Sequence, residues 1–410
     1  MVWAVASGVG PIVGGVFSEE VSWRWCFYIN LPLDGVAFLA LTFFLKLETP
    51  KTALLSGLKA IDWLGVLLII GGVVMFLFGM ESGGQIRPWD SAYTICLIVF
   101  GIFTVCLFFI NEWKFAKYPI MPLRLFSDKS NLAALGVCFC HGFVFIAGSY
   151  YLPLYFQTVL EATPILSGVY LFPFVFSLSF ASATTGIFIK KTGRYQEPIW
   201  FGMVMMTLGF GLLISLDSYA NWAKIVVFQL IAGMGVGPNF QSPLIAIQSH
   251  VKGYDVAVAT ATFGFVRQLA TSISVVLGGV VFQNELKKRR TYLENHLGAR
   301  LADQLAGSSF GSTTRLLRTL PKAEKDAVNT AYTRSLKTMW IFYVAFAALG
   351  IFISLFITKK ELSREKNTAK TGVAEQERVR LEEKAARKER KAMAKGSRPG
   401  TADTAGKEEV

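Results

Sequence analysis

Ten long apolar runs dominate this sequence and constrain its fold more than any other feature. Each run is about as long as the roughly 20 residues that an α-helix needs to cross the hydrocarbon core of a bilayer. The runs cover approximately residues 1–17, 27–46, 63–80, 91–111, 132–157, 165–189, 198–216, 223–248, 257–283 and 338–358. Because backbone groups inside a bilayer must be bonded within the protein, these runs predict an all-α, polytopic membrane helical bundle.

Composition and charge distribution support the same class of protein. Of the 410 residues 53% are apolar and 17% are charged, and the mean hydropathy is +0.45. Most of the formal net charge of +13 comes from two stretches: residues 284–337 hold 11 Lys or Arg against 5 acidic residues, and residues 359–410 hold 15 against 10. No apolar run interleaves basic residues with aromatic ones as a nucleic-acid-binding groove does. We therefore expect contact with the lipid bilayer and no nucleic-acid partner.

The short connections between the runs predict the orientation of the bundle, because Lys and Arg are retained on the cytoplasmic side. Alternate connections hold 11 of these residues, and the other connections hold only 3. This bias places the charged tail that begins at Lys359 in the cytoplasm. It also places the stretch 284–337 outside, as a long loop that translocates regardless of its charge.

A glycine-rich motif lies in the first apolar run. Gly10 and Gly14 are four residues apart, with Gly15 beside them, so one face of the helix is nearly free of side chains and permits close approach of another helix. Pro11 lacks a backbone donor and permits a kink. Residues 23–32 (WRWCFYINLP) then form a turn that leads directly into the second run.

Further motifs follow in the second half of the chain. They are GMGVGPN at 233–239 with Gln241 close behind, ATAT at 259–262, FVRQL at 265–269, and a basic connection at 190–194. Together with the first two motifs, and in the same order, they resemble the major facilitator superfamily, specifically its drug:proton antiporter branch with fourteen spanning helices. The glycine motif of the first run is similar to the antiporter motif of that branch, which lies in its fifth helix.

This resemblance implies a domain organisation. Since the match begins at the fifth helix of the family, we expect a major facilitator fold that lacks its first four helices. The expected parts are a two-span remnant of the N-terminal half (1–46), two linker spans with cytoplasmic loops (47–130), the C-terminal six-helix half (131–358, with the outer loop 284–337) and the cytoplasmic tail (359–410).

Ionisable side chains deep in a bilayer are costly, so each one is a candidate for function. Arg267, beside Gln268, could bind an anionic substrate, pair with a carboxylate or bond to carbonyl groups at a helix end. Asp34 could exchange a proton if it is buried, or could simply lie at the membrane interface. His141 could relay protons or be a packing residue.

A set of polar and aromatic side chains could line a cavity for hydrophobic drug-like molecules. The set comprises Gln229, Asn239, Gln241 and Gln248 of the run 223–248, with Tyr150, Tyr151, Tyr155 and Phe156 of the run 132–157. The alternative is that the polar members bond between helices. Asp62, which precedes the third run, is predicted to be a helix N-cap.

No pattern in the sequence points to an enzyme or a metalloprotein. The five Cys and three His lack metal-ligand spacing, and we find no Walker A, H-E-x-x-H or nucleophile-elbow signature. We therefore expect no metal, no cofactor and no catalytic residue.

The resemblance implies a transmembrane transporter that exports small hydrophobic drugs, toxins or secondary metabolites in exchange for protons. Two helical bundles would rock around a site near the bilayer midplane. The plasma membrane is expected rather than the vacuole. The alternatives are a vacuolar basic amino acid permease of the same fold and a non-transporting, truncated membrane protein.

Overall fold

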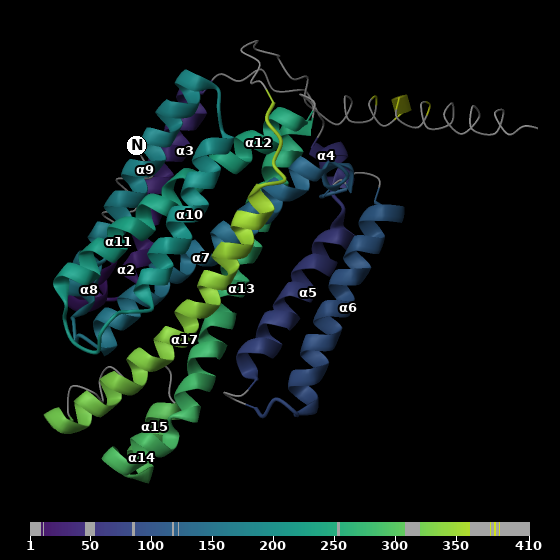
Figure 1. Cartoon of the computed structure of the whole chain (residues 1–410). Coiled ribbons are helices and arrows are strands. Elements are labelled where there is room, and N and C mark those ends of the chain that lie inside the picture. Colours follow the sequence, from purple (N-terminus) through teal and green to yellow (C-terminus); the bar gives the residue numbers. More distant parts are fainter. Residues whose placement is uncertain are drawn as a thin grey trace, which may run out of the picture. The chain divides into compact units, whose positions relative to one another are not determined.

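The computed structural model describes residues 10, 12–45, 54–83, 87–116, 119–121, 123–251, 255–307, 320–360, 378, 381–382 and 385 (Figure 1). Contacts divide the chain into two units, Met1–Lys46 with Asp62–Glu365, and Leu47–Ile61 with Lys366–Val410. The second unit contains the short helix α4 (Leu54–Ala60). The long apolar helices all lie in the first unit.

The described part of the chain is helical, and its one β-bridge joins Gly83 and Arg87. The predicted all-α class is therefore confirmed. The elements of the first unit are η1 (Phe17–Val21), α2 (Trp25–Tyr28), α3 (Asn30–Phe44), α5 (Trp63–Ser82), α6 (Ala92–Lys114), η2 (Leu123–Phe126), α7 (Lys129–Thr158), α8 (Pro164–Tyr170), α9 (Phe172–Thr192), α10 (Gln196–Leu213), α11 (Trp222–Val236), η3 (Gly237–Phe240), α12 (Ser242–His250), α13 (Val256–Lys288), α14 (Arg290–Leu297), α15 (Ala299–Gly307) and α17 (Lys322–Ser354).

Eight segments among the described residues are long and apolar enough to cross a membrane, two fewer than the sequence suggested. The run at 1–17 is one difference, because residues 1–9 and Pro11 lie outside the described residues. The run at 198–216 is the other: it forms α10, which begins at Gln196 and Glu197, and these two polar residues lower its mean hydropathy. Three of the eight segments are pairs of helices separated by a short break, α2–α3, α8–α9 and α11–α12.

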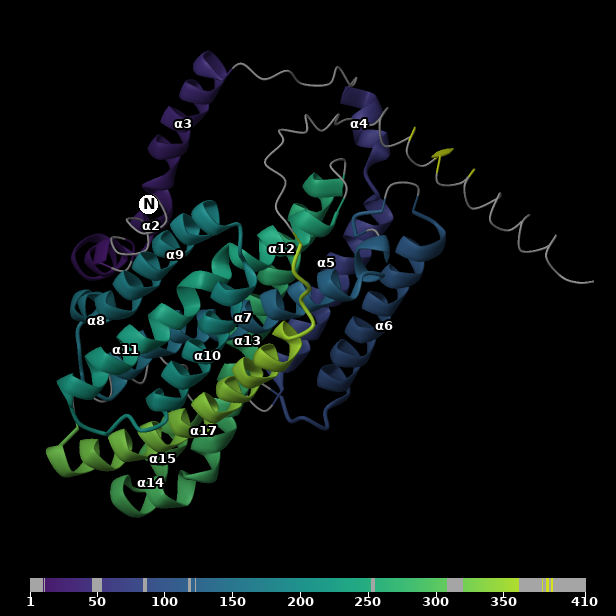
Figure 2. The same ribbon diagram turned by 45° about the horizontal axis from the view of Figure 1, so that its top comes forward.

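Helix α7 lies at the centre of the C-terminal bundle and packs against α13, α17 and α12, while α10 packs against α17 and α11, and α11 against α9 (Figures 1 and 2). Aromatic side chains fill the space between α7 and α17. Phe143 is fully buried and stacks on Phe346 with 4.2 Å between the ring centroids. Tyr343 of α17 is buried beside Phe143, and Trp340 is buried beside Tyr343.

The glycines of the GMGVGPN motif let α11 and η3 approach two neighbouring helices. A Cβ atom at Gly233 or Gly237 would overlap α9, at Ser177 and at the backbone of Leu178 respectively. A Cβ atom at Gly235 would overlap the backbone of Met206 on α10. The alternating glycines of this motif are therefore explained by close helix packing on two sides.

Helices α5 and α6 form an antiparallel hairpin. Asp62 caps α5 by accepting a hydrogen bond from the Gly65 N–H, which confirms the predicted N-cap. Gly72 and Gly101 allow the two backbones to cross closely. The hairpin packs on the rest of the unit through α13, where Phe265 contacts a small cluster around Ile69, Phe108 and Met121.

The stretch 284–337 is largely helical in its described part. Helices α13 and α17 each contain 33 residues, or about 50 Å at 1.5 Å per residue, so both are longer than the hydrocarbon core is thick. Between them α14 and α15 pack on each other and bury Leu293, Ala302 and Leu305 (Figure 2).

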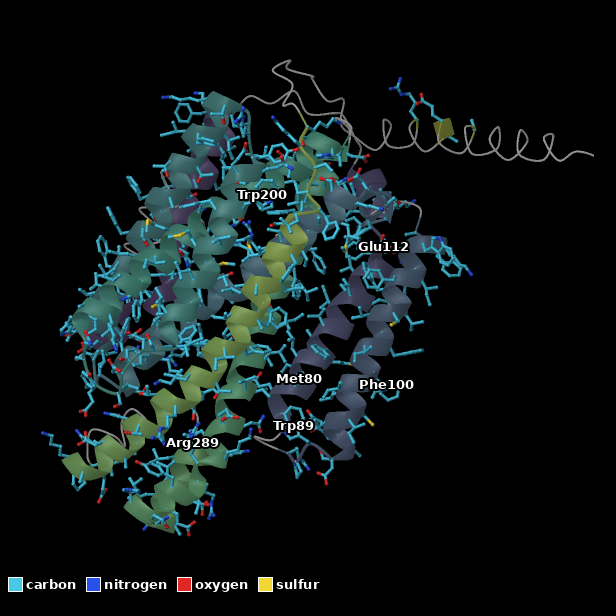
Figure 3. The ribbon with its side chains drawn as sticks, in the orientation of Figure 1. Met80, Trp89, Phe100, Glu112, Trp200 and Arg289 are labelled. Atoms are coloured by element: carbon cyan, nitrogen blue, oxygen red, sulfur yellow. The ribbon has the colours of Figure 1, made fainter. Side chains whose placement is uncertain are left out.

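The other end of α17 is fastened to the bundle by polar contacts. The indole N–H of Trp200, labelled in Figure 3, donates to the Ser354 carbonyl at 3.2 Å. The hydroxyl of Tyr195 donates to the Thr358 carbonyl at 2.9 Å and accepts from the Lys360 N–H at 2.9 Å. These bonds hold the chain at the start of the C-terminal tail against α10.

Candidate functional site

The most distinctive local feature of the bundle is a break in the membrane-crossing helix formed by α11 and α12. The chain tightens into the 3₁₀ turn η3 (Gly237–Phe240) between them. Pro238 and Pro243 lack backbone N–H groups, so the regular ladder of hydrogen bonds cannot continue through this segment. In a bilayer the carbonyl groups that this break releases require other donors.

Two side chains from neighbouring helices supply donors to the break. The Nε2 atom of His141, on α7, lies 3.0 Å from the Val236 carbonyl oxygen. The guanidinium of Arg267, on α13, donates to the Phe240 carbonyl oxygen at 2.7 Å.

Two side chains of the break itself add further bonds. The Ser242 hydroxyl donates to the Pro238 carbonyl at 2.8 Å, and the Asn239 amide donates to the Gly235 carbonyl at 3.4 Å. Four side chains therefore donate hydrogen bonds to backbone carbonyls at the break. Two of them, His141 and Arg267, connect it to α7 and α13.

Arg267 is half-buried between two aromatic rings. Its guanidinium carbon lies 5.1 Å from the ring centroid of Phe240 and 4.7 Å from that of Phe263, distances at which cation–π attraction operates. The Nε atom is buried and has no hydrogen-bond partner, and no carboxylate in the described ranges forms an ion pair with Arg267. Of the three roles considered from the sequence, the contact with helix-end carbonyls is the one that the structure displays.

His141 is fully buried beside the same turn. Its ring stacks on Phe145 at 6.2 Å and meets the edge of Phe240 at 5.0 Å. Because a carbonyl oxygen can only accept, Nε2 must carry the proton in its bond to Val236. The lone pair of Nδ1 is then buried without a partner.

Of the remaining candidates, Gln241 directly follows η3, and the others lie outside the break. Gln241 and Gln268 are exposed, and Asp34 is exposed on α3, a helix without buried residues. Tyr151 and Tyr155 are buried and donate at 2.7 Å to the backbone carbonyls of Val275 and Asp217, respectively.

The other polar residues of the predicted cavity also make bonds between segments. Gln229 donates to the Tyr170 carbonyl at 3.0 Å, and Gln248 donates to the Thr260 hydroxyl at 3.0 Å. Tyr150 is exposed and Phe156 is buried. For Gln229 and Gln248 the structure thus shows the interhelical bonding that was the alternative to a cavity. Tyr151 also bonds to a second helix, and Tyr155 bonds to the connection between α10 and α11.

Of the predicted antiporter motif, Gly15 is the residue with a close neighbour. A Cβ atom at Gly15 would lie 2.9 Å from the Ile165 Cα atom and the Pro164 carbonyl of α8. At Gly10 and Gly14 the described residues leave open space, and Pro11 lies outside them.

A second polar cluster, which the sequence reading missed, lies at one end of the α5–α6 hairpin. The buried carboxylate of Glu112, labelled in Figure 3, accepts hydrogen bonds from the N–H groups of Ile120 at 3.0 Å and Met121 at 3.3 Å. The amide of the neighbouring Asn111 donates to Asp62 at 2.6 Å. The signal in the sequence was the Asn-Glu pair at the end of an apolar run, where polar residues bond to the adjoining loop.

The described residues contain no group of three or more His, Cys, Asp or Glu that could hold a metal ion. The five cysteines are free, and Cys138 and Cys140 are buried on α7.

The profile of the Major Facilitator Superfamily matches residues 1–275. Efflux pump dotC of Dothistroma septosporum is 52% identical over 92% of this chain, and MFS-type transporter ppz2 of Metarhizium majus is 47% identical over 95%. Efflux pump FUS6 of Gibberella moniliformis is 34% identical over 90%. The chain spans 65% of the length of dotC, 67% of ppz2 and 66% of FUS6.

Proposed function

The chain belongs to the major facilitator superfamily, and from this premise we propose that it exports small hydrophobic molecules in exchange for protons. The family and the names of its relatives indicate a transporter rather than an enzyme. Support for export comes from the relatives named as efflux pumps, one of which is 52% identical. Drugs, toxins or secondary metabolites are the substrates that this proposal includes.

The bond between Arg267 and the Phe240 carbonyl is the observation that carries the proposed mechanism. Alternating access needs a midplane element that can change its geometry, and broken helices commonly provide it. Here the break is tied to α13 by Arg267 and to α7 by His141. If the geometry of the break changes, the bond from Arg267 or the bond from His141 must be replaced by another hydrogen bond. We therefore infer that Arg267 is a positioning residue for the broken helix.

His141 is the group that we assign to proton coupling. Its Nδ1 atom presents a lone pair that has no partner in the described structure, so it can accept a proton when water reaches it. The resulting positive charge would lie beside Arg267, and their repulsion would favour rearrangement of the break.

Export of Nile red from yeast cells that express the chain tests the role of Arg267. We expect Arg267→Ala to lower the rate of export at least about tenfold, since losing a charge-assisted hydrogen bond in the membrane costs about 1.5–3 kcal/mol. Arg267→Lys should retain part of the rate because it preserves the charge. Lys191→Ala, a change at an exposed residue in the last turn of α9, is the control. Equal export by Arg267→Ala and the unaltered chain, at equal amounts in the membrane, would exclude this role.

His141→Gln separates proton coupling from packing. The glutamine amide can still donate to the Val236 carbonyl, but it cannot bind a proton near neutral pH. We therefore expect normal amounts of protein whose export of Nile red no longer responds to an imposed pH gradient. A response as large as that of the unaltered chain would remove His141 from the coupling step.

The two alternatives make different predictions for the same cells. A vacuolar basic amino acid permease would carry labelled arginine into vacuoles, and a non-transporting membrane protein would move neither arginine nor Nile red. The exposed position of Asp34, together with the lack of a carboxylate paired with Arg267 in the described ranges, favours export of uncharged molecules over transport of cations.

A further inference from the structure

A groove that contains no residue of α11, η3 or α12 lies beside the α5–α6 hairpin. It has a volume of about 190 Å³ and lies between α5 and α13. The wall contributed by α5 is wholly aliphatic and consists of Ile69, Ile70, Val73 and Val74. Phe265 of α13 also lines the groove and packs against the cluster of Ile69, Phe108 and Met121. This contact holds α13 against α5.

The wall contributed by α13 carries two polar residues on an otherwise apolar surface. Gln268 and Ser272 lie one turn apart, so both side chains face the groove beside Leu269. The Ser272 hydroxyl donates to the Gln268 backbone carbonyl at 3.0 Å and is thus satisfied within its own helix. The Gln268 side chain is exposed, and it forms no hydrogen bond with any residue that the structure describes.

The depth of Gln268 makes this lack of a partner significant. Gln268 lies 12 residues after Val256, the first residue of α13, which corresponds to about 18 Å along the helix. At that depth lipid chains offer neither a donor nor an acceptor, and an unpaired amide is costly in hydrocarbon. A molecule with a hydrogen-bonding group would relieve this cost, whereas an acyl chain would not.

We propose that this groove binds transported molecules by their apolar part, with a carbonyl or hydroxyl oxygen of the molecule hydrogen-bonded to the Gln268 amide. The groove contains no charged side chain, so the molecules that it takes are uncharged. Their apolar part packs against Val73 and Val74. This inference rests on the proposed export function and names the class of substrate.

Binding of two fluorescent probes to the purified chain in phosphatidylcholine nanodiscs tests the proposal. Nile red is uncharged and carries a carbonyl oxygen, whereas diphenylhexatriene is apolar and has no hydrogen-bonding group. We expect Gln268→Leu to weaken Nile red binding about tenfold, the effect of one lost hydrogen bond, and to leave diphenylhexatriene binding unchanged. Thr42→Val, which removes a polar group at an exposed position of α3 outside the groove, should alter neither probe.

A second variant fills the groove without removing the amide. Val74 is 46% exposed, so Val74→Phe should fold normally and should weaken the binding of both probes. Val99→Phe, at a valine on α6 that is 55% exposed and outside the groove, is the matched control.

Equal Nile red affinity in Gln268→Leu, Val74→Phe and the unaltered chain would overturn the proposal. Weakening of both probes by Gln268→Leu would also overturn it, because that result indicates that Gln268 supports helix packing. Both measurements detect binding and need no transport. Groove-dependent binding without export would therefore refute the proposed function alone, and export with groove-independent binding would refute this inference alone.

Discussion

At the scale of single residues, two neighbouring polar side chains of α13 contact different parts of the bundle. Arg267 and Gln268 are adjacent, yet one bonds to the broken helix and the other faces α5. A rotation of about 100° per residue separates their directions, and this rotation can be interpreted only when the neighbouring helices are known. His141 and Asn239 were predicted as separate candidates, and the structure places both at the same break.

Glycine substitutions test close packing at this scale. A Cβ atom at Gly209 of α10 would overlap the backbone of Ala232 on α11, whereas nothing lies within 4 Å of a Cβ atom at Gly211. We expect Gly209→Ala to lower the stability of the purified protein by about 1–3 kcal/mol through overpacking. Gly211→Ala should be neutral or slightly stabilising because alanine favours helix. Thermal unfolding measures both, and similar midpoints would contradict the packing at Gly209.

At the scale of elements, apolar length predicted most of the long helices, and capping chemistry predicted the start of α5. Asp62 was correctly predicted as an N-cap because a carboxylate directly before an apolar run satisfies free N–H groups. The break at η3 was visible only as a motif of glycines and prolines. The donors to its carbonyl groups include His141 and Arg267, which lie on other helices. The motif alone could therefore not identify these donors.

The Asp62 side chain also joins the two helices of the hairpin, and this makes a specific prediction. Asp62→Ala removes the cap on Gly65 and the acceptor for Asn111, which lie at 2.9 Å and 2.6 Å. We expect a loss of about 1 kcal/mol from the cap and a further loss from the unpaired amide. Ser91→Ala removes the cap of α6 and a bond to the Thr94 hydroxyl in the same turn, but no bond to a second helix, and should cost less. A double-mutant cycle of Asp62→Ala with Asn111→Ala should give a coupling energy above about 0.5 kcal/mol, and additive effects would argue against the pair.

At the scale of the whole molecule, positive residues in the connections predict its orientation. The basic last turn of α9 and the connection that follows it are expected in the cytoplasm, and α14 and α15 on the opposite side of the membrane. Membrane-impermeant maleimide should therefore label Arg300→Cys on intact yeast cells, and should label Lys191→Cys only after permeabilisation. Native cysteines are replaced first as a control. The reverse labelling pattern would mean that the proposed orientation, with a cytoplasmic tail, is wrong.

The sequence by itself determined that this is an all-α membrane protein of the major facilitator superfamily, and approximately where its helices lie. Membrane insertion depends on segment length and apolar character, which are local properties that can be counted along the chain. Only the tertiary structure decided which polar side chains meet at the helix break and which face the α5–α13 groove. Spanning helices are apolar on nearly every face and lipid is as apolar as their side chains, so no periodic pattern specifies how each helix is rotated.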